Sequence, residues 1–119
     1  MRWLNVNNPN EPTEEDYYQF ALMELGGDTL NWYGLIDVSQ GYVYSNIKVI
    51  ISEFTKPSES DVNAKITELK NAYASAEYKR KRAREYPSWQ KQLEKIYDDG
   101  IDAWKSEMID PIKNKYPKE

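Results

Sequence analysis

Residues 30–51 read LNWYGLIDVSQGYVYSNIKVII and carry the pattern that separates an α+β fold from an all-helical one. Polar and apolar side chains alternate over residues 30–38 and again over 42–51, which is typical of half-buried strands. Ser39-Gln40-Gly41 between them suits a short turn, so the stretch predicts a β-hairpin. Its expected apolar face is Leu30, Trp32, Ile36, Val38, Val43, Ile47, Val49 and Ile51. Its expected opposite face is Asn31, Tyr33, Asp37, Tyr44, Asn46 and Lys48.

A helix is predicted before the hairpin. A lone hairpin is marginal in water, so its apolar face needs a helix, a third strand or another subunit against it. Thr13 and Asp16 have the spacing of a capping box, which begins a helix. Gly26-Gly27 is a typical helix end. The apolar face expected between these signals is Tyr18, Ala21, Leu22 and Leu25.

A second helix is predicted after the hairpin, with Ser58 or Ser60 as its cap. We expect it to continue through the basic run 79–85 and to end at Tyr86, because Pro87 disfavours helical geometry in the preceding residue. Its apolar seam is Val62, Ile66, Leu69, Tyr73 and Ala76. The seam spans only about two heptads, so packing on the hairpin is favoured over the alternative of a coiled coil.

Further helical segments are predicted at the C-terminal end, where Ser88 can cap a helix and Asp98-Asp99-Gly100 can break it. A last helix follows, with a kink expected near Pro111. The apolar positions of the first segment are Trp89, Leu93, Ile96 and Tyr97, and those of the last are Ile101, Trp104, Met108, Ile109 and Ile112. We expect these faces to make a packed helical module.

Together these elements predict an α+β fold. It has an N-terminal arm and helix, a β-hairpin alone or within a small antiparallel sheet, and two to three C-terminal helices. At 119 residues the chain suits a single domain. Within it we expect an extended arm at 1–12, a helix-plus-hairpin module at 13–57, and a helical module at 58–119 with a break at 86–88.

The residue types exclude most catalytic chemistry. The chain has no Cys and no His, which removes thiol nucleophiles, histidine bases and Cys/His zinc sites. Asp98, Asp99 and Asp102 surround a glycine but lack the spacing of a calcium loop. No apolar run reaches the roughly 20 residues of a membrane helix. We therefore expect no enzyme activity, cofactor, metal or membrane contact.

Charge is divided unevenly along the chain. Residues 1–60 carry three basic and nine acidic side chains, whereas residues 61–119 carry 13 basic and 11 acidic ones. The most basic run includes Arg80, Arg82 and Arg84. These side chains can form a solvated helix face, pair with acids on another chain or contact phosphates. Flanking glutamates and the net charge of −4 disfavour phosphates, so no nucleic-acid partner is expected.

The last third of the chain combines several spaced motifs. They are Arg80, Arg82 and Arg84; Tyr86-Pro87-Ser88; Gln92-Leu93; Tyr97; Gly100; Trp104-Lys105; and Lys115-Tyr116-Pro117. This ending resembles a family of short tailed-bacteriophage proteins that are usually encoded near tail-fibre or baseplate genes. The resemblance covers residues 54–118. Trp89 departs from the family's usual Ile, and Asp98 from its His or other polar residue.

The resemblance implies a non-enzymatic protein of the virion tail, or a tail-fibre assembly protein present in the host cytoplasm during assembly. Its partners would be other phage tail proteins or further copies of itself. The alternative is a small phage protein that binds and modulates a host bacterial enzyme. The expected contact residues are Trp3, Leu4, Arg80, Arg82, Arg84, Trp89 and Trp104. For Trp3 and Leu4, docking on the chain's own core is the competing expectation.

Overall fold

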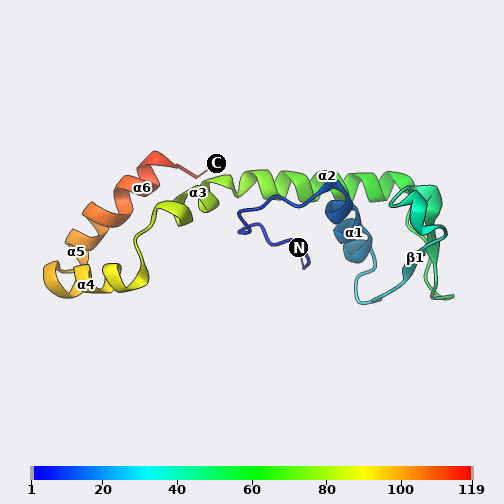
Figure 1. Ribbon diagram of the computed structural model, residues 1–119, viewed down its shortest axis with the longest axis horizontal. Helices are drawn as coiled ribbons and strands as arrows, with labels where there is room; N and C mark the ends of the chain where they lie inside the picture. Colours follow the sequence, from blue (N-terminus) through cyan, green and yellow to red (C-terminus); the bar gives the residue numbers. More distant parts are fainter. Residues whose placement is uncertain (1, 119) are drawn as a thin grey trace. The chain divides into compact units, whose positions relative to one another are not determined.

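The computed structural model describes residues 2–118 (Figure 1). Met1 and Glu119, the outermost residues of the predicted arm and helical module, lie outside the described residues. The fold is α+β, as predicted, because a two-stranded antiparallel sheet accompanies a series of helices.

Two compact units divide the chain near residue 75. Unit 1 contains residues up to Val6 together with Asn10–Ala74, and unit 2 contains Asn7–Pro9 together with the residues from Ser75. The predicted modules instead met between residues 57 and 58. The difference arises because the long helix that follows residue 58 packs on the elements before it.

Helix α1, Glu14–Leu25, has the predicted bounds. The Thr13 hydroxyl accepts a hydrogen bond from the Asp16 amide at 3.1 Å, and the Thr13 amide donates to the Asp16 carboxylate at 3.2 Å. These two bonds confirm the capping box. The fully buried side chains of α1 are Tyr17, Ala21 and Leu22. Tyr18, predicted on the buried face, is only half-buried.

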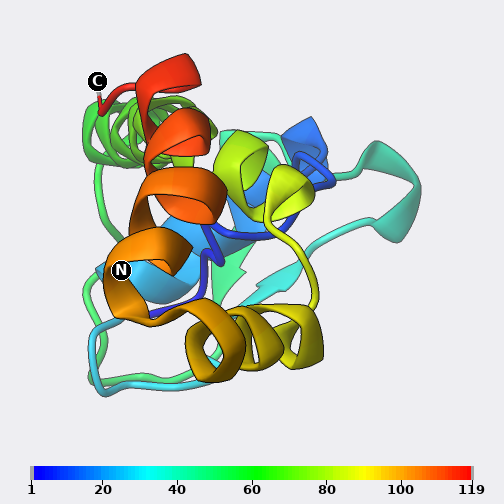
Figure 2. The same cartoon turned by 90° about the vertical axis from the view of Figure 1, so that its left-hand side faces the viewer.

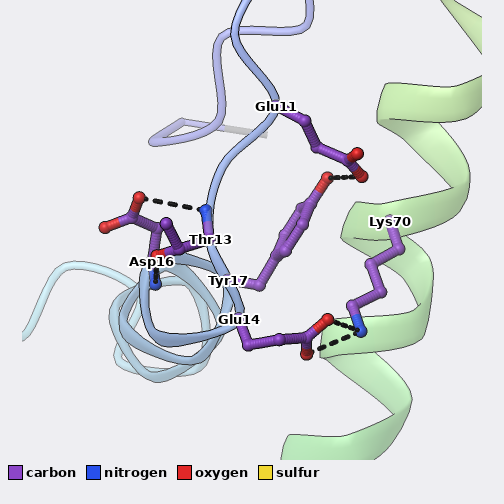
Figure 3. Close-up of polar contacts among 6 residues, drawn as sticks. All are labelled: Glu11, Thr13, Glu14, Asp16, Tyr17 and Lys70. Atoms are coloured by element: carbon purple, nitrogen blue, oxygen red, sulfur yellow. Dashed lines mark hydrogen bonds and ion pairs between the residues drawn. The ribbon is translucent and has the colours of Figure 1, made fainter.

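Polar contacts join the start of α1 to helix α2, Glu59–Ser75 (Figure 3). The Lys70 ammonium lies 2.8 Å from both carboxylate oxygens of Glu14. The buried Tyr17 ring lies beside this pair, and its hydroxyl donates to Glu11 at 3.1 Å. An exposed ion pair contributes little stability, so the apolar burial around Tyr17 is the stronger link between the two helices.

The hairpin forms with short strands. Strand β1, Tyr33–Leu35, pairs antiparallel with strand β2, Ile47–Val49, and Tyr33 is opposite Val49 while Leu35 is opposite Ile47. Opposite residues share one face of a sheet. All four pack in the same apolar cluster, so Tyr33 and Leu35 belong to the core-facing side. The predicted assignment of Tyr33 to the other face is wrong.

The predicted three-residue turn is also wrong. Residues 36–46 form a longer loop that contains two short 3-10 helices, η1 (Val38–Gln40) and η2 (Tyr44–Asn46). Four residues of the expected apolar face are exposed: Leu30, Ile36, Val38 and Val43. Leu30 precedes Asn31, whose φ of 56° interrupts an extended backbone. The other three lie in the loop, where the alternation of strand faces no longer applies.

Asn46 closes this loop. Its Oδ1 accepts from the Asp37 amide at 3.0 Å, and its Nδ2 donates to the carbonyls of Asp37 and Gly41, each at 2.8 Å. The side chain is 7% exposed. The buried amide is therefore fully hydrogen-bonded inside the loop, and the Asn46 carbonyl also accepts from the Ile36 amide at 2.9 Å.

Two buried clusters line one side of α2 in unit 1. The first contains Leu4, Tyr17, Ala21, Leu69 and Tyr73, and the second contains Leu22, Trp32, Ile47 and Val62. Ile66 packs against both. Four of the five residues of the predicted seam therefore pack against α1 and the hairpin, whereas Ala76 is buried but lies beyond the end of α2.

Trp32 is the largest fully buried side chain of unit 1. Its indole N–H donates to the Leu22 carbonyl at 2.8 Å, and its ring stacks on Phe54 with centroids 4.5 Å apart. A Cβ on Gly26 would lie 2.5 Å from this ring. Gly26 therefore ends α1 and also leaves room for the indole.

Unit 2 begins with a break that the sequence did not predict. Helix α2 ends at Ser75, and Ala76, with φ −92° and ψ 6°, separates it from helix α3, Glu77–Glu85. The prediction of one continuous helix is wrong at this residue. The end of α3 before Tyr86 is confirmed, in agreement with the constraint from the following proline.

The remaining helices fold back in a hairpin-like path (Figure 2). The Ser88 hydroxyl accepts from the Lys91 amide at 3.3 Å and caps helix α4, Trp89–Asp99, as predicted. The chain turns at Gly100, whose φ is 89°. It continues as α5 (Ile101–Trp104), the π-helix η3 (Lys105–Ile109) and α6 (Asp110–Lys115). The wider π turn directly precedes α6, and Pro111 lies in the first turn of α6, where a proline is tolerated.

Candidate functional site

Trp3 and Leu4, the apolar residues of the arm, both dock on unit 1. Leu4 is 7% exposed and lies in the cluster that contains Tyr17 and Leu69. The Trp3 amide donates to the Glu24 carboxylate at 3.2 Å, and the side chain is half-buried. Of the two alternatives for these residues, the structure shows docking on the chain's own core, which leaves Leu4 almost no surface for a partner.

Trp3 also lines an aromatic hollow of about 420 Å³ in unit 1, together with Trp32, Tyr33 and Tyr42. Within residues 2–118 the buried Trp3 indole N–H has no hydrogen-bond partner. Burial, with a smaller contribution from Tyr42, raises the pKa of Tyr33 to about 12. The Tyr33 hydroxyl therefore stays protonated at neutral pH and does not act as a base there.

Two arginines of the basic run are engaged in unit 2. Arg80 is 9% exposed. The Arg82 Nε donates to the Tyr116 carbonyl at 2.8 Å, and its guanidinium lies 4.9 Å from the Tyr78 ring centroid. Arg84 is exposed. Of the three predicted contact residues in α3, Arg84 is thus the one that keeps the surface a partner would need.

The C-terminal end of the chain contacts α3. Glu85 accepts hydrogen bonds from the Lys115 ammonium at 2.8 Å and from the Tyr116 hydroxyl at 2.7 Å. These two bonds hold the pKa of Glu85 below its usual value, and the bond to Glu85 raises the pKa of Lys115. The arginine-rich run and the Lys-Tyr-Pro ending therefore belong to one network of contacts.

Gln92 connects two further motifs of this ending, Tyr86-Pro87-Ser88 and Trp104-Lys105. Its Nε2 donates to the Pro87 carbonyl at 2.9 Å, and its Oε1 accepts the Trp104 indole N–H at 3.2 Å. Trp104 is half-buried. This predicted contact residue therefore holds α5 to the start of α4, and part of its surface is already used inside unit 2.

The apolar side of α4 is open. Trp89, Leu93 and Tyr97 are 72%, 57% and 90% exposed, and no residue of α4 is fully buried. Residues four apart lie on the same side of a helix, so these three form a continuous surface that we name the α4 stripe. The predicted position of the helix is confirmed, whereas the expectation that this face is packed is wrong. The expected contact residues include Trp89 of this stripe but not Leu93 and Tyr97, although their spacing is visible in the sequence.

The inner side of α4 is held by polar contacts. The Lys95 ammonium lies 2.7 Å from the Asp99 carboxylate and 2.9 Å from that of Glu107 in η3. The hydrogen bond to Asp99, followed by that to Glu107, raises the pKa of Lys95. With Gln92, Lys95 turns one side of α4 toward the following helices and leaves the α4 stripe on another side.

Other kinds of site lack structural support. In residues 2–118, no three acidic side chains come together as potential metal ligands. No described helix combines the length and apolarity needed to cross a membrane. No protein-family model, curated protein or solved structure matches this chain. The candidate site is the α4 stripe, a row of large exposed apolar side chains on one side of a helix.

Proposed function

We propose that this chain is a phage tail-associated structural protein or tail-fibre assembly protein that acts by protein–protein contacts, with the α4 stripe as its main contact surface. The observation that carries the proposal is the row of three large apolar side chains on one exposed side of α4. The tail setting is supported by the resemblance of residues 54–118 to short tail-associated phage proteins.

The energetics of the α4 stripe support a binding role. Full burial of a large apolar side chain contributes about 1.5–3 kcal/mol. Three such side chains on rigid helix turns can supply a useful part of a binding free energy. Helices of this kind bind by laying their apolar side against a groove or helix of a partner, with anchors spaced about one turn apart. Trp89 and Tyr97 also belong to the residue types that dominate binding energies at interfaces.

The test is capture of tail proteins by the tagged chain. The double substitution Leu93→Ala/Tyr97→Ala should abolish capture of a phage tail-fibre or baseplate protein. Lys91→Ala is the matched control, because Lys91 is exposed on the other side of the same helix. Capture that survives the double substitution would refute this role of the α4 stripe. Mass spectrometry of purified virions then separates a structural protein, which is present, from an assembly protein, which is absent.

A second candidate is a protein that binds and modulates a host enzyme. The observation that favours it is the loop at residues 36–46, which exposes Ile36, Val38 and Val43 in the acidic half of the chain. Stoichiometric capture of one host enzyme would support this function if Val38→Asp abolished it and the α4 double substitution did not. The opposite pattern of losses would reject it.

A further inference from the structure

Acidic side chains border the α4 stripe along one flank. Each residue of a helix is rotated by about 100° from the one before it, which places Glu94 about 60° beyond Tyr97 and Asp98 about 40° further. Both acids are exposed. Within residues 2–118 neither has an ion-pair partner. Glu94 and Asp98 lie nearer the stripe than the exposed Lys91 on the same flank, so a protein covering the α4 stripe meets negative charge first at this rim.

The opposite flank offers no free cation. Gln92 is bonded to Pro87 and Trp104, and Lys95 is bonded to Asp99 and Glu107. Lys91 belongs to the acidic flank, about 20° beyond Asp98 and about 160° from Leu93 around the helix. The flanks of the stripe are thus acidic on one side and internally satisfied on the other.

This charge arrangement disfavours a second copy of the chain as the occupant. Two identical antiparallel helices place like flanks together, so Glu94 and Asp98 would face the same acids of the other copy. A parallel pair places the acidic flank beside the flank where Lys95 is already paired. Like charges brought together at an interface oppose binding.

We propose that the α4 stripe binds an amphipathic helix of a different protein, one whose apolar side chains are bordered by lysine or arginine. Trp89, Leu93 and Tyr97 contact the apolar side of that helix, and Glu94 and Asp98 pair with its basic rim. The inference rests on the proposed binding role of α4 and adds the chemical character of the partner.

The test uses two synthetic helical peptides with the same leucine stripe, one with lysine and one with glutamate at the bordering positions. Each is titrated into the full chain and followed by calorimetry. We expect the lysine peptide to bind at least about tenfold more tightly, because complementary rim charges attract and like charges repel. Glu94→Lys/Asp98→Lys should reverse this preference.

Glu15→Lys/Glu53→Lys is the control for net charge, because it makes the same charge change at two exposed acids of unit 1. It should keep the preference for the lysine peptide. Equal loss of preference in the control would overturn the inference, since attraction would then follow net charge alone. Equal binding of the two peptides would overturn it too, as would sedimentation showing that the chain dimerises through α4.

The inference and the proposed function fail in different ways. If Leu93→Ala/Tyr97→Ala abolishes capture of a tail protein but the peptides are not distinguished, the binding role stands and the basic-rim partner is rejected. If the α4 substitutions change neither capture nor peptide binding, both the basic-rim partner and the proposed binding role of α4 are rejected. Circular dichroism of each variant shows that the helices remain formed.

Discussion

Helices α2 and α4 carry similar apolar patterns but have opposite surroundings. In α2, Val62, Leu69 and Tyr73 are buried against α1 and the hairpin. In α4, the apolar side chains spaced by one turn are exposed. Periodicity therefore indicates that a helix has an apolar side, but it does not tell whether the same chain covers that side. A covered side stabilises the fold, and an uncovered one is available for binding.

The same substitution at one position in each helix gives the strongest test of this comparison. Leu69→Ala should lower the free energy of unfolding by about 2–5 kcal/mol, because Leu69 is fully buried and its loss leaves a cavity. Leu93→Ala should change it by less than about 0.5 kcal/mol, as is usual at exposed positions. Urea unfolding measures both. Similar losses of unfolding free energy in the two variants would mean that the chain itself covers the α4 stripe, and the two helices would then not differ in burial.

A smaller effect is expected from adding volume beside the core of unit 1. Gly26→Ala should cost about 1–3 kcal/mol, because the new methyl group would meet the packed Trp32 ring at 2.5 Å. Gly100→Ala beside α4 is the informative counterpart. Its Cβ meets nothing within 4 Å, so its cost is limited to the backbone strain of a φ of 89°. A larger loss of stability for Gly100→Ala than for Gly26→Ala would contradict close packing around Gly26 and open space around Gly100.

Alkaline pH should weaken unit 1 through Tyr33. Its pKa is raised from 10.0 to about 12 in the folded chain, so its contribution to stability is complete below pH 10 and is lost as the pH rises toward 12. Tyr33→Phe should therefore flatten the fall in stability between pH 10 and 12. Equal slopes for the two proteins, measured by urea unfolding at each pH, would exclude burial of this hydroxyl.

The smallest effect is expected from acid in unit 2. The pKa of Glu85 is lowered by Lys115 and Tyr116, so its contribution is present at neutral pH and is lost as the pH falls below 4.5 through the lowered value. Glu85 is exposed and solvent screens its contacts. NMR signals of the Tyr116 ring should shift with this titration and lose the shift in Glu85→Gln. An unchanged titration of the Tyr116 signals in the variant would show that Glu85 does not contact Tyr116.

Sequence reasoning was most accurate where local signals act alone. Thr13 with Asp16, Ser88 and Gly100 each begin or end a helix by chemistry confined to a few residues, and each prediction is confirmed. The predictions are wrong where the local structure depends on residues that are distant along the chain. Asn46 bonds to Asp37 and Gly41 within a loop that the alternation predicts as strand, and strand alternation carries no sign of such a side-chain bridge.

The candidate site shows the same division. The spacing of Trp89, Leu93 and Tyr97 is visible in the sequence, yet we interpreted this side as packed. The expected contact residues also include Leu4 and Trp104. Leu4 lies in the core of unit 1, and the Trp104 indole N–H donates a hydrogen bond to Gln92. An aromatic residue in a sequence gives no measure of its exposure, because exposure depends on residues that are distant along the chain.

Composition and contacts between near neighbours are enough to specify the α+β class, most helix ends and the lack of Cys and His chemistry. The lengths of the strands, the break at Ala76 and the covering of the apolar sides depend instead on residues that are distant along the chain. Burial is a property of three-dimensional packing. Two helices with the same periodicity can therefore differ, one serving as core and the other as a binding surface.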